Sequence, residues 1–286
     1  MLGLGIMGGG MARRLLGAGF PLTVFNRDAG KARPFASEGA TVAGSPREAA
    51  ANAEIVFTMV ADDGASRAMW DGERGAIAGA RRGAVLVECS TVTVSRITEL
   101  AAAAERAGCA FADAPVTGSK PQAAAGELTF LVGAADDTLA RIRPALAVMG
   151  KTIHHLGPVT SGALVKLINN FLCGVQAASL AEAMAIIERS PLDRGRAVEA
   201  IINGSPGSPV MKTLAARMTA PDFTPNFYLH LLAKDMGYAI AEGQSRAVPM
   251  ATAATALGML RAAIDHGDGD KDMAAVVEQF RSTARA

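Results

Sequence analysis

Cysteine, histidine and aromatic residues are scarce in this chain of 286 residues. It contains three cysteines and four histidines, and 5% of its residues are aromatic. Cys89, Cys109 and Cys173 stand far apart, with neither the pairing pattern of a disulfide scaffold nor the short spacings of a metal site. We therefore expect no bound metal and a reducing, cytoplasmic compartment.

An excess of charge of one sign is also missing. Lysine and arginine total 28 against 27 acidic residues, which gives a net charge of +1. No basic stripe with interleaved aromatic residues occurs, so nothing supports nucleic-acid binding. The N-terminus lacks the basic and then apolar lead of a signal peptide. The longest apolar stretch, residues 164–187, is interrupted by lysine, asparagine, glutamine and glutamate, which argues against a membrane span.

Glycine, in contrast, is abundant, and the segment Gly3-Leu4-Gly5-Ile6-Met7-Gly8 has the pattern GxGxxG. In a dinucleotide-binding turn the first glycine allows a tight turn, the second lets the backbone approach a pyrophosphate, and the third lets a helix pack on a strand. We expect a helix over residues 9–16 with its N-terminal end towards the phosphates. The predicted cofactor-binding residues are Gly3, Gly5, Ile6, Met7 and Gly8.

The apolar run over residues 22–25 ends in Asn26 and Arg27. A site for NAD usually has an acidic residue there, which binds the ribose 2′-hydroxyl, whereas an arginine pairs with a 2′-phosphate and stacks on adenine. Asn26 and Arg27 thus favour NADP(H) over NAD(H). Two alternatives stay open: Asp28 takes the acidic role one position later, or Arg27 is a solvated loop residue.

The first half of the chain alternates short apolar runs with alanine-rich stretches. Short runs of this kind separated by helices indicate βαβ units around a parallel sheet. Only Met1 and Leu2 precede the glycine turn, so the strand expected there is clipped or begins upstream. The predicted strands are 22–25, 55–60, 85–89, 110–112 and 129–132, and the helices between them are 30–38, 45–53, 65–80 and 95–107, with Ser45 and Thr93 as N-caps.

The pattern changes near residue 157, after which no alternating strand signal returns. Proline and glycine separate six helical stretches, which predicts a second, all-helical domain. The expected fold is an α/β Rossmann N-terminal domain over residues 1–157 plus an all-α C-terminal domain over residues 158–286. The predicted helices are 162–189, 193–203, 209–218, 228–244, 250–265 and 273–280.

Three segments carry candidate chemistry. Lys166 and Asn170 are four apart in an apolar helix, so they share a face and need a polar destination, such as a cleft between domains. A lysine that snorkels to the surface is the alternative. The loop over residues 113–119 follows a strand and offers amides and hydroxyls suited to a carboxylate, unless it is an ordinary turn. The third segment is residues 227–236, where Lys234 and Asp235 lie beside an apolar helical face. Ser90 and Thr91, after the strand 85–89, are also placed to line a cofactor cleft.

Taken together, these segments resemble the β-hydroxyacid dehydrogenase family, which includes 3-hydroxyisobutyrate dehydrogenase and glyoxylate/succinic semialdehyde reductase. The resemblance rests on the glycine turn, Ser90-Thr91-Val92, residues 113–118, residues 162–170 and Lys234-Asp235, in the expected order along nearly the whole chain. It implies an active site between the two domains, with Lys166 as the catalytic lysine and Asn170 as its partner. It further assigns Thr117, Gly118, Ser119, Phe227 and Asp235 to the substrate and Thr91 and Lys234 to the cofactor.

Two positions depart from the usual family pattern. Thr117 stands where serine is general, and Ser119 replaces a glycine common in 3-hydroxyisobutyrate dehydrogenases. Asn26-Arg27 and the segment over residues 117–120 look closer to the NADPH-dependent glyoxylate/succinic semialdehyde reductases. The resemblance implies hydride transfer between nicotinamide and a small carboxylate-bearing carbonyl or alcohol, in a homo-oligomer.

Two other functions compete with this one. Imine reduction occurs on the same scaffold, but such relatives usually lack the lysine that stands here at position 166. The other is a non-catalytic nucleotide-binding interaction module. Such a module is expected to have lost the lysine or gained a further domain, whereas Lys166 is present here.

Overall fold

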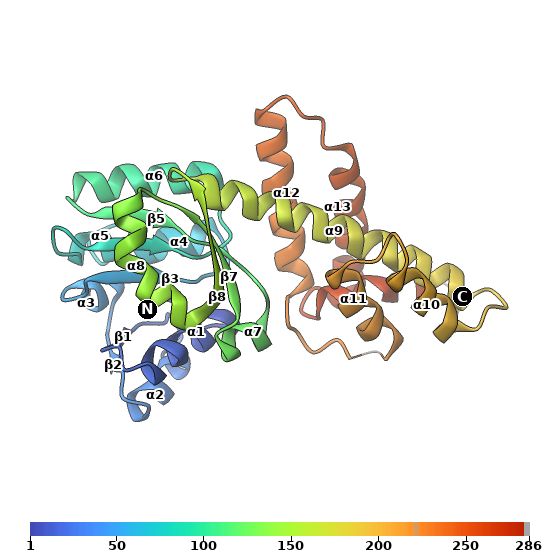
Figure 1. The fold of residues 1–286 in the computed structure, drawn as a ribbon, viewed down its shortest axis with the longest axis horizontal. Helices are drawn as coiled ribbons and strands as arrows, with labels where there is room; N and C mark the ends of the chain where they lie inside the picture. The colour runs from blue at the N-terminus through green and yellow to red at the C-terminus, as the bar shows by residue number, and fades with distance from the viewer. Residues whose placement is uncertain (221, 283–286) are drawn as a thin grey trace. The chain divides into compact units, whose positions relative to one another are not determined.

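A computed structural model describes residues 1–220 and 222–282 (Figure 1). The chain divides into two compact units, Met1–Lys166 and Leu167–Ala286. The division falls inside the long helix α9 (Ser161–Glu188), nine residues after the boundary that the sequence suggested at residue 157.

The first unit contains a mostly parallel sheet. Neighbouring strands β3, β4 and β5 run parallel, and β1 pairs with β2 in the same sense. The last part of the sheet is mixed, because β7 pairs antiparallel with β5 and β6 and parallel with β8. The strands are β1 (Thr23–Val24), β2 (Thr41–Val42), β3 (Ile55–Thr58), β4 (Val85–Glu88), β5 (Ala110–Asp113), β6 (Val116–Thr117), β7 (Leu128–Gly133) and β8 (Gly150–Gly157).

Residues 1–3 complete this sheet. Leu2 is fully buried and forms parallel bridges to both Phe25 and Thr58, so it lies between β1 and β3. Its amide donates to the Phe57 carbonyl at 2.8 Å, and the Met59 amide donates to the Leu2 carbonyl at 2.9 Å. In the described residues, the strand expected before the glycine turn is represented by the two bridges of Leu2.

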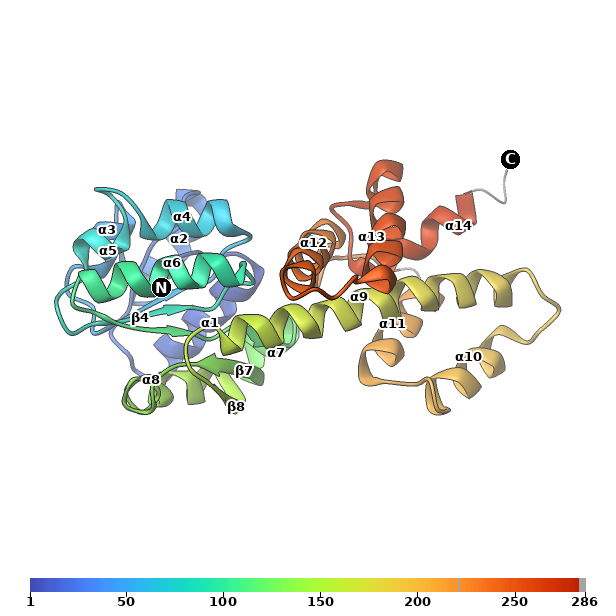
Figure 2. The same ribbon diagram turned by 90° about the horizontal axis from the view of Figure 1, so that it is seen from above.

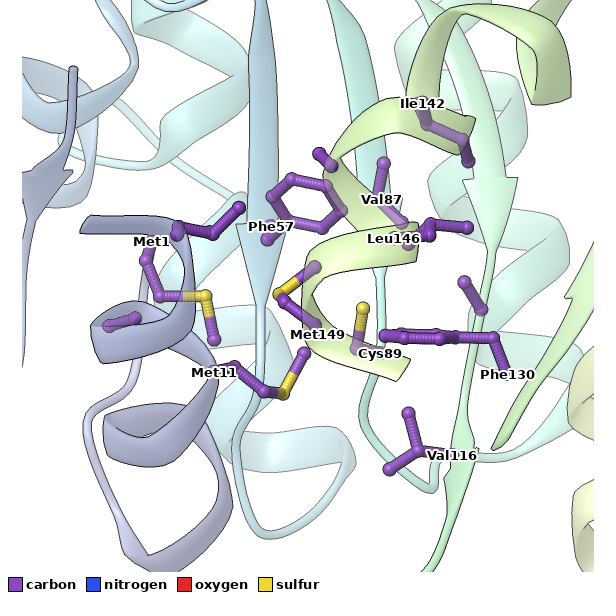
Figure 3. Packing of buried hydrophobic residues seen from close by; sticks show 14 of the residues in the cluster. Met1, Met11, Phe57, Val87, Cys89, Val116, Phe130, Ile142, Leu146 and Met149 are labelled. Carbon is purple, nitrogen blue, oxygen red and sulfur yellow. The ribbon is translucent and has the colours of Figure 1, made fainter. Parts of the chain in front are cut away.

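Alternate residues of the strands point to two separate cores. Val85 and Val87 of β4 belong to one apolar cluster with Met11 of α1, while Leu86 belongs to a second cluster on the opposite face. Figure 3 shows part of the first cluster, where side chains from α1, α8 and the strands meet. Figure 2 shows α4 and α6 on one side of β4 and α8 on the other. The sheet is thus covered by helices on both faces, as the predicted Rossmann fold requires.

Most predicted helices of the first unit are present, with shifted ends. The predicted helix 65–80 is two helices, because Gly72 adopts a left-handed φ of +76° between them. Ser45 and Thr93 accept hydrogen bonds from the amides of Glu48 and Arg96, which confirms both as N-caps. The helices are α1 (Ile6–Gly17), α2 (Ala29–Ser37), α3 (Pro46–Ala50), α4 (Asp63–Trp70), α5 (Ala76–Gly79), α6 (Val94–Arg106), α7 (Lys120–Ala125) and α8 (Asp136–Met149).

The described residues of the second unit form helices and no strand, as predicted, with one isolated antiparallel bridge between Tyr228 and Asp272. Its core gathers apolar side chains from every long helix, including Ala181 and Met184 of α9. By length and composition α9 is apolar enough to cross a membrane, but half of its most apolar window is buried inside the protein. The remaining helices are α10 (Arg194–Asn203), α11 (Pro209–Thr219), α12 (Leu229–Ser245), α13 (Ala251–Ala263) and α14 (Glu278–Ser282), with a short 3-10 helix over Met273–Val277.

Candidate active site

The glycine turn has the geometry of a phosphate-binding turn. Gly3 has a φ of +87°, and a Cβ there would lie 2.2 Å from the Met59 carbonyl oxygen. A Cβ on Gly8 would lie 2.1 Å from the Gly3 carbonyl oxygen, so both glycines are required by packing. Gly5, in contrast, has an ordinary φ of −69° and no heavy atom within 4 Å of a Cβ built on it. Space therefore lies open in front of Gly5.

The N-terminus of helix α1 borders that open space. Gly5 is its N-cap and provides no side-chain cap for the first amides of the helix, which include those of Ile6 and Met7. Uncapped amides at a helix N-terminus attract anions. The turn therefore fits the pyrophosphate of a dinucleotide, as its sequence predicted.

The end of β1 is tied to this turn. Asn26 Oδ1 accepts a hydrogen bond of 2.9 Å from the Leu4 amide, so Asn26 holds strand and turn together. Asp28 Oδ1 accepts from the Gly30 amide at 2.9 Å and thereby caps α2. Arg27, between them, is exposed. Because the Asp28 carboxylate already serves as a helix cap, Arg27 is the better placed of the two for a ribose substituent.

A buried glutamate supports the loop that carries Thr91. Glu88, at the end of β4, is fully buried and accepts hydrogen bonds from the side chains of Thr58, Ser66 and Trp70 and from the Ser90 amide. Ser90 Oγ in turn accepts from the Val60 amide at 2.8 Å. The loops after β3 and β4 are thus joined at one edge of the sheet. Glu88 was not predicted from the sequence, where the available signal is a lone acid in the apolar run 85–89.

The predicted carboxylate loop is held by β6 and the start of α7. Thr117 pairs with Thr129 of β7, and Gly118 has a φ of +106°, which favours glycine. The amide and Oγ of Ser119 both lie 2.9 Å from Gln122 Oε1. The Ser119 hydroxyl proton is therefore directed to Gln122, and the hydroxyl oxygen is left as an acceptor. Thr117 Oγ1 and the Gly118 amide are accordingly better donors for a carboxylate than Ser119.

Lys166 and Asn170 share one face of α9, a single turn apart. Both are buried, at 9% and 2% exposure, which disfavours a snorkelling surface lysine at position 166. Asn170 Nδ2 donates to Asp235 Oδ2 at 2.5 Å, and Asn170 Oδ1 accepts from Asn169 Nδ2 at 3.0 Å. The Asn170 amide is thus fixed by side chains on both sides.

The second unit brings Asn170, Lys234 and Asp235 together. Lys234 Nζ lies 2.9 Å from Asp235 Oδ1 and 4.9 Å from the centre of the Tyr238 ring. The Phe227 amide donates to Asp272 Oδ2 at 3.2 Å, which holds the segment that leads into α12. The first unit brings together the glycine turn, Asn26 and the loop of Thr91.

Comparisons with known proteins show which family this chain belongs to. A family model described as the NAD binding domain of 6-phosphogluconate dehydrogenase matches residues 1–157. A second, described as NAD-binding of NADP-dependent 3-hydroxyisobutyrate dehydrogenase, matches residues 160–280. The chain is 34% identical to chloroplastic glyoxylate/succinic semialdehyde reductase 2 of Arabidopsis thaliana, over 98% of this chain and 78% of that protein. The chain belongs to the β-hydroxyacid dehydrogenase family.

Other family members show the same relationship. The chain is 32% identical to 2-(hydroxymethyl)glutarate dehydrogenase of Eubacterium barkeri, over 97% of this chain and 92% of that protein. The structure of Mycobacterium tuberculosis 3-hydroxyisobutyrate dehydrogenase with L-serine superimposes with a TM-score of 0.88 at 30% identity, and covers 98% of this chain and 97% of that one.

Family membership confirms several predictions. This β-hydroxyacid dehydrogenase is an oxidoreductase acting on CH–OH groups, with a Rossmann-type NAD(P)-binding domain followed by a helical domain. The roles of the individual site residues stay predictions.

Proposed function

We propose that this β-hydroxyacid dehydrogenase transfers a hydride between NADP(H) and a small aldehyde acid or the corresponding hydroxyacid. The nicotinamide supplies or accepts the hydride when it is bound. The single observation that carries the proposal is the buried Lys166, one helical turn from Asn170, whose amide Asp235 fixes.

Lys166 acts as the proton donor in the direction of reduction. Its ammonium group protonates the oxygen of the substrate carbonyl as negative charge develops there, and takes the proton back in oxidation. Asn170 presents Oδ1, an acceptor, on the side away from Asp235, and this oxygen orients the lysine or a substrate hydroxyl. The Thr117 hydroxyl and the Gly118 amide bind the substrate carboxylate. Ser119, whose amide donates to Gln122, holds the loop in place.

The preference for NADP(H) rests on Arg27. Arg27 is exposed and lies three residues after the end of β1. Its guanidinium pairs with a 2′-phosphate through charge-assisted hydrogen bonds and stacks on the adenine ring. Asp28, the competing residue, is engaged with the Gly30 amide. NADPH is therefore the expected cofactor.

A two- to four-carbon aldehyde acid is the expected substrate class. The support is the carboxylate loop, the similarity to a glyoxylate/succinic semialdehyde reductase, and the hydroxyl of Thr117, whose methyl group narrows the pocket relative to serine. A narrower carboxylate pocket favours unbranched acids over branched ones.

The test is initial rates of NADPH oxidation with glyoxylate, succinic semialdehyde and a cyclic imine, in the parent and in Lys166→Ala. We expect the two aldehyde acids to react and the substitution to lower kcat by roughly 10²–10⁴, the usual contribution of a positioned acid. NADPH affinity should stay within twofold, because the glycine turn is untouched.

Lys212→Ala is the matched control, since Lys212 is an exposed lysine of helix α11. It should retain parental turnover. Turnover of Lys166→Ala at the level of this control would refute Lys166 as proton donor. Reaction with the imine and not with the acids would replace the proposed substrate class by that of an imine reductase.

A further inference from the structure

A buried aspartate joins the predicted carboxylate loop to the helix that carries Lys166. Asp113 ends β5, is fully buried, and directly precedes the loop over residues 114–119. Its Oδ1 accepts a hydrogen bond of 2.8 Å from the Thr160 amide, and its Oδ2 accepts one of 2.7 Å from the Ala163 amide. One carboxylate thus binds both the residue before α9 and the first turn of α9.

Two glycines enclose this carboxylate. Gly133 of β7 is the strand partner of Asp113, and a Cβ there would lie 2.5 Å from Asp113 Oδ1. A Cβ on Gly162 would lie 2.9 Å from Asp113 Oδ2 and 2.2 Å from the Leu131 carbonyl oxygen. The carboxylate therefore fills its space, and the first turn of α9 packs directly against the sheet.

The backbone before α9 is strained in a way that this contact explains. Thr160 has a φ of +88°, a left-handed conformation that is rare for a β-branched residue. In this conformation its amide points at Asp113 Oδ1. Such strain persists only where the surroundings over-determine it, and it marks positions where geometry matters for function.

We propose that Asp113 is a positioning residue that fixes Lys166 relative to the loop that binds the substrate carboxylate. Lys166 follows Ala163 by three residues in the same helix, so a shift of the first turn of α9 moves Lys166 with it. Both carboxylate oxygens of Asp113 accept hydrogen bonds from backbone amides, so Asp113 acts without touching the substrate. This inference rests on the proposed function, since it assigns Asp113 a role that acts through Lys166.

The protonation state of Asp113 depends on its burial. Loss of water around the carboxyl group raises the pKa of Asp113 to about 6, and the hydrogen bonds from the Ala163 and Thr160 amides oppose the shift. At pH 8 the group is a carboxylate and accepts from both amides. All assays below are therefore made at pH 8.

Asp113→Asn is the first test. Asparagine keeps the shape but places an NH2 group against one of the two amide donors, so one hydrogen bond is lost and the start of α9 shifts. We expect kcat to fall at least tenfold, with the dissociation constant of NADPH within twofold of the parent. Gly162→Ala is the second variant: its Cβ displaces the same turn while Asp113 is intact, and the same pattern is expected.

A double-mutant cycle distinguishes positioning from a separate effect. If Asp113 acts through Lys166, then Asp113→Asn has no further effect on kcat in a Lys166→Ala background. Multiplicative losses in the double variant would overturn the inference, as would parental kcat in both Asp113→Asn and Gly162→Ala. Parental turnover of Lys166→Ala alone would instead overturn the proposed function, so the two failures are distinguishable.

Glu188→Gln is the control for destabilisation of the same helix. Glu188 ends α9 and pairs with Arg281 and with Arg194, the latter at 2.8 Å. It lies 22 residues beyond Lys166, roughly 33 Å at about 1.5 Å of rise per residue. Glu188→Gln should lower the melting temperature and leave kcat at the parental value. An equal loss of kcat in this control would mean that any weakening of α9 suffices, and would also overturn the positioning role.

Discussion

Asp235 Oδ2 accepts a hydrogen bond of 2.5 Å from Asn170 Nδ2, across 65 residues of sequence. A carboxylate only accepts hydrogen bonds, so this contact determines which end of the Asn170 amide faces Asp235. Asn170 Oδ1 is therefore directed away from Asp235, where it accepts from Asn169 and is available to a further donor on the face of α9 shared with Lys166.

Removal of Asp235 should therefore weaken catalysis through Asn170. In Asp235→Ala the amide is no longer fixed, and we expect kcat to fall roughly 10–100-fold, the size of effect that a small misplacement of a catalytic group produces. Steady-state kinetics of Asp235→Ala, Asn170→Ala and the double variant would measure it. A double variant that is much worse than either single variant would contradict action through Asn170.

A substitution in the glycine turn should weaken cofactor binding without weakening the fold. Gly5 has an ordinary φ and open space around its Cβ position, so Gly5→Ala should leave the melting temperature within a few degrees of the parent. The added methyl group would stand between the protein backbone and the pyrophosphate that must approach it, so the dissociation constant of NADPH should rise at least tenfold. Fluorescence titration and thermal unfolding together test this.

Gly8→Ala is the informative comparison for Gly5→Ala. Its Cβ would lie 2.1 Å from the Gly3 carbonyl oxygen, so this variant should lose stability as well as affinity. If Gly5→Ala binds NADPH as the parent does, the cofactor does not approach this turn.

Local patterns predicted most of the fold, and non-local pairing accounts for what they missed. The glycine turn and the apolar strands β3, β4 and β5 carry their own signals, because burial on both faces of a parallel sheet requires continuous apolar runs. Helix α8 was not predicted, although it packs Leu139, Ile142 and Leu146 into the core; like the predicted helix α2, it has a proline inside it. Strand β8 was not predicted either, because it mixes exposed histidines with apolar residues and depends on pairing with β7.

The residues of the candidate site also fall into those that a local pattern predicts and those that depend on distant contacts. Lys166 and Asn170 were found from a spacing of four residues, which any helix converts into a shared face. The roles of Asp113, Glu88 and Asp235 depend on contacts with residues distant in sequence: 47 residues separate Asp113 from Thr160. A sequence pattern identifies such acids as unusual in apolar surroundings but does not supply their partners.

Cofactor preference should depend on Arg27. NADPH is expected to bind more tightly than NADH, and Arg27→Ala should reduce that preference, because charge-assisted hydrogen bonds to a 2′-phosphate contribute about 1.5–3 kcal/mol each. NADH affinity should change little. Dissociation constants of both cofactors for both proteins decide the question, and equal affinities in the parent would eliminate the role of Arg27.

The protein should form dimers or larger homo-oligomers. Ile186 near the end of α9 and Leu192, four residues after the end of this helix, are 69% and 58% exposed. Large exposed apolar side chains are typical of surfaces where subunits associate. Symmetric pairing is the commonest way to cover them. Ile186→Glu should raise the dissociation constant of the oligomer, whereas Val42→Glu, an exposed apolar position of the first unit, should not. Sedimentation of the parent as a monomer at micromolar concentration would contradict the prediction.

The stability of the fold should depend on pH through Asp113. Burial disfavours the charged form and raises the pKa of Asp113 from its ordinary value of 3.8 to about 6 in the folded protein. Between these values the folded state holds a proton that the unfolded state has released. The contribution of Asp113 to stability therefore decreases as the pH rises from about 4 to about 6, by roughly 3 kcal/mol in total, and is constant above that range.

Other carboxylates change stability in the opposite direction, because ion pairs lower the pKa of Glu188 and Glu99. The measurement that isolates Asp113 is therefore the difference in unfolding free energy between the parent and Asp113→Asn, from urea titrations at pH 4, 5, 6, 7 and 8. Asparagine does not titrate, so the stability of the parent relative to the variant should be greatest at pH 4 and should decline towards pH 6. A difference that is independent of pH would mean that Asp113 has the same pKa in the folded and unfolded protein, and an increase with pH would mean that its amide hydrogen bonds outweigh its burial.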